Sequence, residues 1–517
     1  MTITTAKLPA RALRLTPFAL AALLLSAECH ADWKFTPRVD LRETYTDNAN
    51  LQRDELASRE WVSEAVPAFT LVENGDRLKL NASGEWRMFA YSKDAPGLQN
   101  NALQYQAQAL AKVIDQLFYV DAGLARTRQT ISAFGQLSNN SFSSANTSQI
   151  SSWRISPYLQ HSFGRTATAT VRYTRDAVDG GANNAFGNSL ASTRSASLVS
   201  GTSFTDIGWN LSYNHQDLYS GVAGDSMSEN STAGLRWRLV PRFSLTADVT
   251  YDDYEYPTLG DRTRGRGWSG GFIWTPSSRT SVQASYGRRY YGKTGSLAAS
   301  HRNRRSVWSL DYSDAVTTSR SQLLLPTTLD TASMLDRMFQ TAFPDPLLRQ
   351  QAVQSYMSAA GLPPSLASSI NYLSNRYIRM KRLQGAVVLT GARSNLTLSV
   401  FRDERRALSL QQSDSALLSD RLASLNDNVR QRGVVLNLDR RLSSNTTALA
   451  SVSAVHVQSI DTGVVNSNRE LSLGLTRRFD AKTRGSLEFR HVRGALSVIS
   501  KDTYSENAIA ATLSVLY

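Results

Sequence analysis

The last eleven residues of the chain alternate between two kinds of side chain. Ile509, Ala511, Leu513, Val515 and Tyr517 fall on one parity, and mostly small or polar residues fall on the other. Because successive side chains of a β-strand point to opposite faces, this pattern predicts a strand with one apolar face that ends on an aromatic ring. A sheet with one apolar and one polar face suits a barrel that has lipid outside and water inside.

The N-terminus predicts export. An apolar run over residues 17–27 follows a short basic segment, and the small residue Ala31 offers a cleavage point before Asp32. The basic residues are Lys7, Arg11 and Arg14. Residues 1–31 are therefore expected to be a signal peptide. A membrane anchor is the less favoured interpretation, because the run is shorter than the ~20 residues that a bilayer needs.

Composition limits the chemistry and the partners. The only cysteine, Cys29, lies in the leader, so the exported chain is expected to hold no disulfide and no thiolate metal site. The net charge is +14, and loss of three bases and one acid with the leader lowers it to +12. Excess arginine favours anionic partners such as lipid phosphates or acidic polymers. Export makes nucleic acid the least favoured of these.

From Trp33 onward, strand-like segments of ~10 residues alternate with connections that are in turn short and long. The short connections are 73–76, 163–165, 205–206, 240–243, 276–279, 391–394, 442–445 and 480–483. The long, polar connections are 131–147, 177–193, 217–230, 253–265, 291–303, 407–427 and 495–506. Short turns on one rim and long loops on the other are typical of an all-β, antiparallel outer-membrane barrel, here of about 20–22 strands. The short-turn rim is expected to face the periplasm.

Two soluble all-β folds are weaker alternatives. A β-sandwich usually has ~100 residues, whereas this rhythm continues over most of the chain without a change of composition. A β-propeller would show a repeat of blade length, and the sequence shows none.

One segment departs from the strand pattern. Residues 326–374 have helical spacing, with Pro344 ending one helix and Gly361 before Pro363-Pro364 ending the next. We therefore expect a first barrel part over residues 32–325, a short helical insertion over 326–374 that plugs the lumen or caps a mouth, and a closing barrel part over 375–517. Strands at 303–313 and 376–390 should both run towards the periplasm. An odd strand must then join them, at 314–325, unless the insertion itself threads the lumen.

Two groups of basic residues are candidate sites. The first has the parity expected to face the lumen and would favour anions there: Arg172, Arg236, Arg238, Arg484 and Arg490. The second has outward parity near the long-loop rim: Arg288, Arg379, Lys381, Arg430 and Arg432. Charges facing hydrocarbon cost a few kcal/mol but almost nothing at the interface, so we expect the second group to pair with lipopolysaccharide phosphates. Snorkelling side chains with no specific lipid are the alternative.

Other chemistry is weakly indicated. The five histidines after the leader, His161, His215, His301, His456 and His491, show no metal-binding spacing. No Gly-x-Ser-x-Gly elbow is present, so we expect no catalytic residue, no metal and no cofactor. Acidic residues at 252–255 and at Asp217, Asp225 and Glu229 have the oxygen ligands that calcium prefers, although hydrated loop carboxylates are the simpler interpretation.

The two ends of the barrel are expected to meet. If the strands number about 22, the last one runs downward and places Tyr517 beside Trp33, and the first and last strands pair to remove the exposed edges that lipid forbids. The aromatic end is also the kind that the barrel assembly machinery reads. Two aromatic girdles are predicted by tryptophans near short turns, at Trp33, Trp209, Trp237 and Trp274, and near long loops, at Trp61 and Trp268.

Residues 33–51, from Trp-Lys-Phe-Thr-Pro to Thr-Asp-Asn-Ala-Asn-Leu, resemble the start of an outer-membrane β-barrel family that accompanies the PEP-CTERM/exosortase sorting system and its exopolysaccharide loci. Pro37 and the stretch Glu-Thr-Tyr-Thr-Asp-Asn at 43–48 carry the likeness. The end of the insertion at 361–364 and Phe-Arg-Asp-Glu-Arg-Arg at 401–406 are also similar. The family has no established catalytic residues, so the resemblance implies none here.

The resemblance implies a non-enzymatic outer-membrane barrel that serves exopolysaccharide export or surface sorting. Its implied partners are outer-membrane lipid, lipopolysaccharide, the assembly machinery, and exopolysaccharide or periplasmic export components. A porin-like channel for small anionic solutes is the alternative, and an outer-membrane hydrolase is the third choice. A TonB-dependent receptor shares the strand count but needs a large N-terminal plug domain, and here the first strand is expected to begin at Trp33.

Overall fold

The protein is described by a computed structural model over residues 33–93, 98–130, 134–136, 140–144, 146–180, 188–220, 225–255, 262–318, 320, 377–408, 428–496 and 502–517. The predicted signal peptide (1–31) and the predicted helical insertion (326–374) lie outside these residues. Both therefore stay predictions.

The described chain is almost entirely β-strand. The first half contains β1 (Lys34–Thr46), β2 (Glu60–Asn74), β3 (Leu78–Tyr91), β4 (Asn101–Ile114), β5 (Phe118–Thr130), β6 (Thr147–Phe163), β7 (Ala167–Asp179), β8 (Asn188–Ser200), β9 (Ile207–Ser220), β10 (Ser226–Val240) and β11 (Phe243–Glu255). The second half contains β12 (Arg262–Ser277), β13 (Thr280–Arg289), β14 (Gly292–Arg302), β15 (Ser306–Thr318), β16 (Tyr377–Thr390), β17 (Ser394–Ala407), β18 (Val429–Arg441), β19 (Thr446–Ser459), β20 (Val465–Arg478), β21 (Thr483–Ala495) and β22 (Thr503–Leu516). A single 3-10 turn, η2 (Asp54–Leu56), follows β1.

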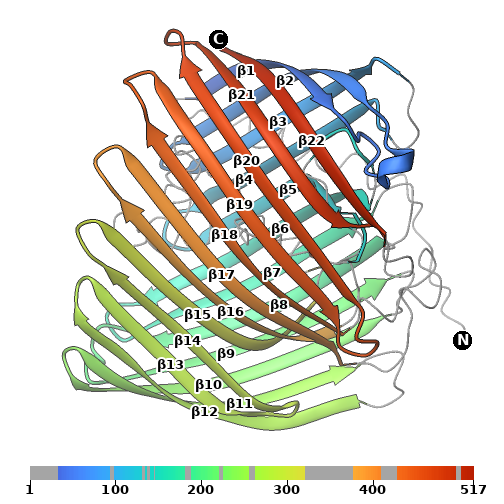
Figure 1. Ribbon diagram of the computed structural model, residues 1–517. Helices are drawn as coiled ribbons and strands as arrows, with labels where there is room; N and C mark the ends of the chain where they lie inside the picture. The colour runs from blue at the N-terminus through green and yellow to red at the C-terminus, as the bar shows by residue number, and fades with distance from the viewer. Residues whose placement is uncertain are drawn as a thin grey trace, which may run out of the picture.

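These strands form one closed sheet of 22 strands within the described ranges. Each strand pairs antiparallel with the next, and β1 pairs with β22 from Arg38–Leu516 to Thr46–Ala508. Figure 1 shows the result, with the blue first strands beside the red last strands. The predicted antiparallel barrel of about 20–22 strands is confirmed. Closure leaves no unpaired edge, which a sheet in lipid requires.

One predicted loop is a strand. Residues 291–303 were expected to form a long loop, but residues 292–302 form β14, which follows a two-residue turn at Tyr290 and Tyr291. β14 supplies the odd strand that the parity of the barrel requires. The strand expected at 314–325 is therefore wrong, because residues 306–318 form one upward strand, β15.

The outer surface is apolar. Large side chains such as Trp61, Trp237, Trp268 and Trp274 are exposed on the outside, near one rim or the other. An apolar surface of this extent would aggregate in water and is stable in a bilayer. Among the described residues, no helix has the length and hydropathy needed to cross a membrane.

The seam between the first and last strands is staggered. The backbone N–H of Tyr517 donates to the carbonyl of Pro37 at 3.1 Å. Trp33 lies four residues before Pro37 in the chain, just ahead of the first residue of β1. Its neighbour Lys34 is in register with Val72 of β2. The two strands thus close the barrel as expected, but Tyr517 lies beside Pro37 rather than Trp33. Closed barrels need such a stagger because their strands tilt.

Candidate functional site in the lumen

Alternation along each strand decides which side chains face the lumen. On β7, Val171 is 57% exposed and Tyr173 is 41% exposed on the apolar outer surface, so Arg172 between them faces inward. The same alternation with exposed Leu235, Trp237 and Leu487 assigns the other predicted lumen arginines. Arg236, Arg238, Arg484 and Arg490 all lie on the inner face.

Three of these five arginines are paired with carboxylates. Arg172 lies 3.6 Å from Asp121. Arg238 lies 3.2 Å from Asp206, and Arg490 lies 3.2 Å from Glu506. Arg236 and Arg484 have no ion pair within the described part of the chain. Pairing reduces the positive charge that these three arginines contribute to the lumen, since parity shows which way an arginine points but not which acid it meets. Preference for anions stays a prediction.

Further ion pairs, which the sequence did not single out, continue this balance around the inner face. They are Arg42–Glu488 at 3.2 Å, Arg87–Glu64 at 2.7 Å, Arg87–Glu85 at 2.9 Å, Arg154–Asp121 at 3.4 Å, Arg289–Asp252 at 3.4 Å and Arg382–Asp403 at 3.0 Å. Acids and bases on the same strand, on neighbouring strands or one strand apart therefore neutralise each other. The lumen is lined by fixed polar groups of both signs.

The long-loop end of the seam carries a cluster of hydrogen bonds, which we call the seam clamp: Thr46, Asp47 and Asn48 with Ser505, Glu506 and Asn507. The Thr46 hydroxyl donates to Glu506 at 2.8 Å. The backbone N–H and side-chain amide of Asn507 both donate to the Asp47 carboxylate at 2.7 Å. The Asn48 amide donates to the carbonyl of Ser505 at 2.8 Å. Three consecutive residues at the end of β1 thus hold the start of β22.

Glu506 is the buried centre of this clamp. Its carboxylate is almost fully buried, and it accepts from Thr46, from Arg490 and from the Asn140 amide at 2.6 Å. Burying a carboxylate is costly unless it is paired and hydrogen-bonded, and here both conditions are met. The seam clamp is therefore also an anchor for Asn140, which belongs to a loop far away in the sequence.

That loop, the β5–β6 connection, enters the barrel. Its described residues are 134–136 and 140–144, which we call the inner loop. The Ser141 hydroxyl lies 3.4 Å from the inward-facing Glu64 of β2. The ring of Phe142 meets Phe89 of β3 edge-on at 6.4 Å and is buried with Val62. The long connection predicted at 131–147 does separate β5 from β6, and its described residues turn inward against the wall.

Main-chain contacts fix the inner loop on both sides. Asn466 of β20 donates to the carbonyl of Gly135 at 3.5 Å. Arg128 of β5 donates to the carbonyls of Asn140 and Ser143, and the side-chain amide of Gln99 donates to the carbonyl of Ser141. The inner loop therefore follows the wall from β20 past the seam to β4 and occupies part of the outer mouth of the lumen.

A second chain segment reaches across the inner face. Arg320 follows β15 but is buried against the inner wall of β7 and β8, where its side chain pairs with Asp176 and donates to Ser189 at 2.9 Å. Burial lowers the pKa of Arg320, and the Asp176 carboxylate opposes this shift. An arginine keeps its charge in proteins, so the contact is an ion pair.

The predicted rim residues lie on the outer face. Arg288, Arg379, Lys381, Arg430 and Arg432 share the parity of exposed Tyr286, Leu383 and Val434. Two of them are neutralised by the protein itself. Arg379 lies 2.6 Å from Asp314, and Arg430 lies 3.1 Å from Glu404. Whether the group binds lipopolysaccharide stays a prediction.

The described ranges assemble no metal-binding grouping. The five histidines lie on outward positions of β6, β9, β14, β19 and β21, which are not neighbouring strands. Asp252 faces inward and accepts from Asn230, whereas Asp253 has the opposite parity, so the acidic run does not gather its oxygens. No group of three or more His, Cys, Asp or Glu side chains there could hold a metal ion.

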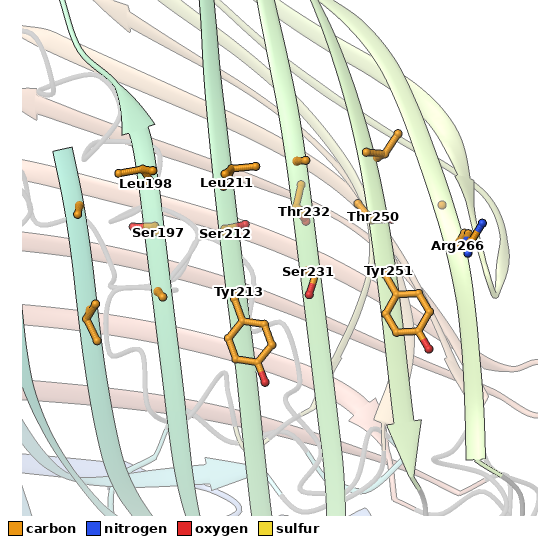
Figure 2. A pocket seen from close by; sticks show the side chains of 16 residues that line it. Ser197, Leu198, Leu211, Ser212, Tyr213, Ser231, Thr232, Thr250, Tyr251 and Arg266 are labelled. Carbon is orange, nitrogen blue, oxygen red and sulfur yellow. The ribbon is translucent and has the colours of Figure 1, made fainter. Parts of the chain in front are cut away.

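Two grooves lie on the outer side of the barrel wall. A groove of about 770 Å³ follows the outer face of β7–β12. Figure 2 shows the rings of Tyr213 and Tyr251 along it, with Leu198 and Leu211 nearby. A second groove of about 840 Å³ lies over the seam, beside Leu41 and Leu513. Both have apolar linings on the lipid-facing side, so they suit acyl chains rather than a transported solute.

Sequence reasoning missed the seam clamp and the inner loop, although one signal for the clamp was present. Residues 43–48 carried the family resemblance without a role, and Thr46, Asp47 and Asn48 of that stretch form half of the clamp. The inner loop gave no comparable signal, because its contacts reach residues as far as 366 positions away in the sequence.

No family model and no curated protein matches the sequence. Among solved structures, the siderophore receptor PirA from Pseudomonas aeruginosa is 10% identical, over 94% of this chain and 80% of that one, with a TM-score of 0.45. A mutant of the ferric enterobactin receptor PfeA from the same organism is 10% identical over 94% and 80%, with a TM-score of 0.49. The FrpB iron transporter from Neisseria meningitidis is 10% identical over 96% and 83%, with a TM-score of 0.49. These likenesses assign neither a family nor a ligand to this chain. Its own closed sheet and apolar exterior make it an outer-membrane β-barrel.

Proposed function

We propose that the protein is a non-enzymatic conduit or scaffold of the outer membrane that serves exopolysaccharide export and the surface sorting of the PEP-CTERM/exosortase system. The observation that carries the proposal is the lumen lining, in which acids and bases are paired with each other, as in Arg42–Glu488 and Arg382–Asp403. A hydroxyl-rich polymer can exchange hydrogen bonds along such a surface without being held by net charge. Charges already neutralised by the wall do not trap a passing chain.

The width of the barrel supports the same proposal. Barrels of 16–18 strands leave an aqueous channel, and a 22-stranded barrel is wider still. A barrel of this width would leak small solutes unless something occupies the lumen. The inner loop, anchored at Glu506 and Glu64, occupies part of the outer mouth. Residues 33–51 resemble the start of barrels from exopolysaccharide loci, so the polymer that we expect is an exopolysaccharide.

The proposal is tested by blocking the lumen chemically. Gln106 faces inward on β4 and Ala107 faces outward on the same strand. The variants Gln106→Cys and Ala107→Cys are each treated with a bulky maleimide. The attached group then lies in the lumen in the first variant and on the outer surface of the barrel in the second. In a strain that lacks the natural protein, we expect labelled Q106C to reduce secreted polysaccharide and labelled A107C to leave it unchanged. Equal secretion from both, or undiminished secretion without the protein, would refute the conduit.

One observation favours the second candidate, a porin-like channel for small anionic solutes. Arg236 and Arg484 both lie on the inner face near the short-turn rim and have no ion pair in the described chain. Unpaired arginines there would attract anions. Single-channel recording of the intact protein separates the two candidates. A steadily open, anion-preferring pore supports the channel, and a pore that is closed at rest supports regulated export.

A further inference from the structure

The outer face of β17–β19 carries three basic side chains in one row. Arg402 is the register partner of Arg432, and Arg432 is the register partner of His456. Directly opposed residues on neighbouring strands have Cβ atoms ~5 Å apart, and like charges in such positions repel. Both arginines are exposed on the outside of the barrel. An anion bound between Arg402 and Arg432 would relieve this repulsion.

The next two strands extend this surface. Arg469 of β20 and Arg493 of β21 are also register partners, and both are exposed. They share the outward parity of Leu471 and Leu487. Arg402, Arg432, His456, Arg469 and Arg493 together form what we call the arginine patch, which spans five consecutive strands.

The protein offers this patch no free carboxylate. Among the described outward positions of β17–β21, the single acidic residue is Glu404. Its carboxylate is already shared by Arg406 at 2.8 Å and Arg430 at 3.1 Å. Within the described chain, no ion pair involves any of the four arginines of the patch, which are Arg402, Arg432, Arg469 and Arg493. The missing negative charge must come from outside the protein.

The position of the patch identifies the source of that charge. On β18, Leu438, Leu436 and Val434 face lipid between the short-turn rim and Arg432. On β20, Leu475, Leu473 and Leu471 lie in the same way between the short-turn rim and Arg469. The arginines thus begin where the aliphatic surface ends, on the side of the long-loop rim. A guanidinium is well matched to phosphate because it binds two oxygens at once. A phosphate at this level, beside an acyl-covered surface, belongs to a membrane lipid.

We propose that the arginine patch binds the phosphate groups of a phosphorylated glycolipid in the outer leaflet. The proposal is independent of what passes through the lumen. It also changes the residues expected to make the contact. Arg379 and Arg430 are occupied by Asp314 and Glu404, whereas Arg402, Arg469 and Arg493, which parity alone did not single out, are free of described carboxylates.

Two of the five strands that carry the patch, β18 and β20, also provide a matched control. Arg440 on β18 and Arg477 on β20 face outward at the opposite, short-turn end of the same strands. The variants R432Q/R469Q and R440Q/R477Q therefore remove equal charge from the same strands at opposite rims. Both are first checked for the heat-dependent gel mobility of a folded barrel.

Binding is measured by native mass spectrometry in detergent, with diphosphorylated lipid A as the probe. We expect the wild type and R440Q/R477Q to bind alike, and R432Q/R469Q to bind about tenfold more weakly for each guanidinium removed. Lipid A stripped of its phosphates should bind the wild type as weakly as R432Q/R469Q binds the intact lipid. Equal binding by the two double variants would overturn the proposal. Displacement by millimolar inorganic phosphate would also overturn it, by showing that free phosphate rather than a lipid is the ligand.

Discussion

Thr46 on the first strand donates a 2.8 Å hydrogen bond to Glu506 on the last strand, across the line where the barrel closes. Most neighbouring strands of the barrel are joined by a chain connection, but β1 and β22 are the two ends of the sheet and are held by non-covalent contacts alone. The seam clamp adds Asp47–Asn507 and Asn48–Ser505 to the backbone ladder. It also ties the inner loop to the seam through Asn140. Closure of the barrel and occupation of its mouth are thus coupled through one carboxylate.

Replacing Glu506 should destabilise the barrel strongly. Glu506→Ala leaves the Arg490 guanidinium buried without its carboxylate, and breaking a buried pair in this way costs roughly 3–5 kcal/mol. The measurement is guanidinium unfolding of the protein refolded in vesicles. The control is Glu55→Gln, which removes an exposed partner 3.3 Å from Arg53 at the same rim and should cost less than about 1 kcal/mol. Equal losses in the two variants would mean that the clamp adds nothing to closure.

The barrel itself was predictable because its physics is local. Period-two alternation in segments such as Leu396, Leu398 and Val400 follows from one strand meeting lipid on one side, and no knowledge of its neighbours is needed. The sequence pattern did not predict β14, because few of its outward positions carry large apolar side chains. Gly295, Ala299 and His301 accompany the single large residue Leu297, so its composition is that of a polar loop. The requirement for an even number of strands indicated that one strand was missing. We predicted that strand after β15, whereas it lies before β15.

The site was predictable only in part, because its electrostatics are non-local. Parity gave the inward direction of Arg172 and Arg490, but their partners Asp121 and Glu506 lie on other strands. A single sequence does not show which arginine and which carboxylate the pairing of the strands brings together. The inner loop is harder still, since Asn140 is 366 positions from Glu506 and is polar like any surface loop residue.

The inner loop should be possible to cross-link to the wall without any change in the pore. Ser141→Cys with Glu64→Cys replaces two side chains that lie 3.4 Å apart, while Arg87 keeps Glu85 as a partner. We expect a disulfide to form under mild oxidation, detected by mass spectrometry. Single-channel conductance of the oxidised protein should equal that of the wild type, because the loop already lies at this place.

The control pair is Ser141→Cys with Thr397→Cys, since Thr397 lies on the inner face of β17, away from the strands that the loop contacts. This pair should stay reduced. A drop in conductance when the Glu64 pair is oxidised would show instead that the inner loop normally spends time outside the lumen.

Ion preference should depend on the unpaired arginines and not on the paired ones. Arg236→Gln with Arg484→Gln removes positive charge that no described carboxylate neutralises, so the reversal potential in a salt gradient should move towards cation preference. Arg172→Gln should change it little, because Asp121 keeps Arg154 at 3.4 Å. Asp121→Asn should move it the opposite way, since it leaves Arg172 without its acid and Arg154 with Asp176 alone. A larger effect from Arg172→Gln than from the Arg236 and Arg484 pair would contradict this order.

The Arg320–Asp176 pair should be asymmetric in its response to mutation. Both side chains are buried, 3% and 4% exposed, but Asp176 is also the register partner of Arg154. Asp176→Asn leaves the Arg320 guanidinium without a carboxylate and should cost roughly 3–5 kcal/mol, whereas Arg320→Met leaves Asp176 beside Arg154 and should cost less. The double variant should be more stable than the sum of the two losses implies, because the second change removes the charge that the first leaves unpaired. Unfolding of all four proteins in vesicles gives the coupling energy. A coupling near zero would mean that Arg320 is held by its hydrogen bonds to Ser189 and to the carbonyl of Asp176, and not by the ion pair.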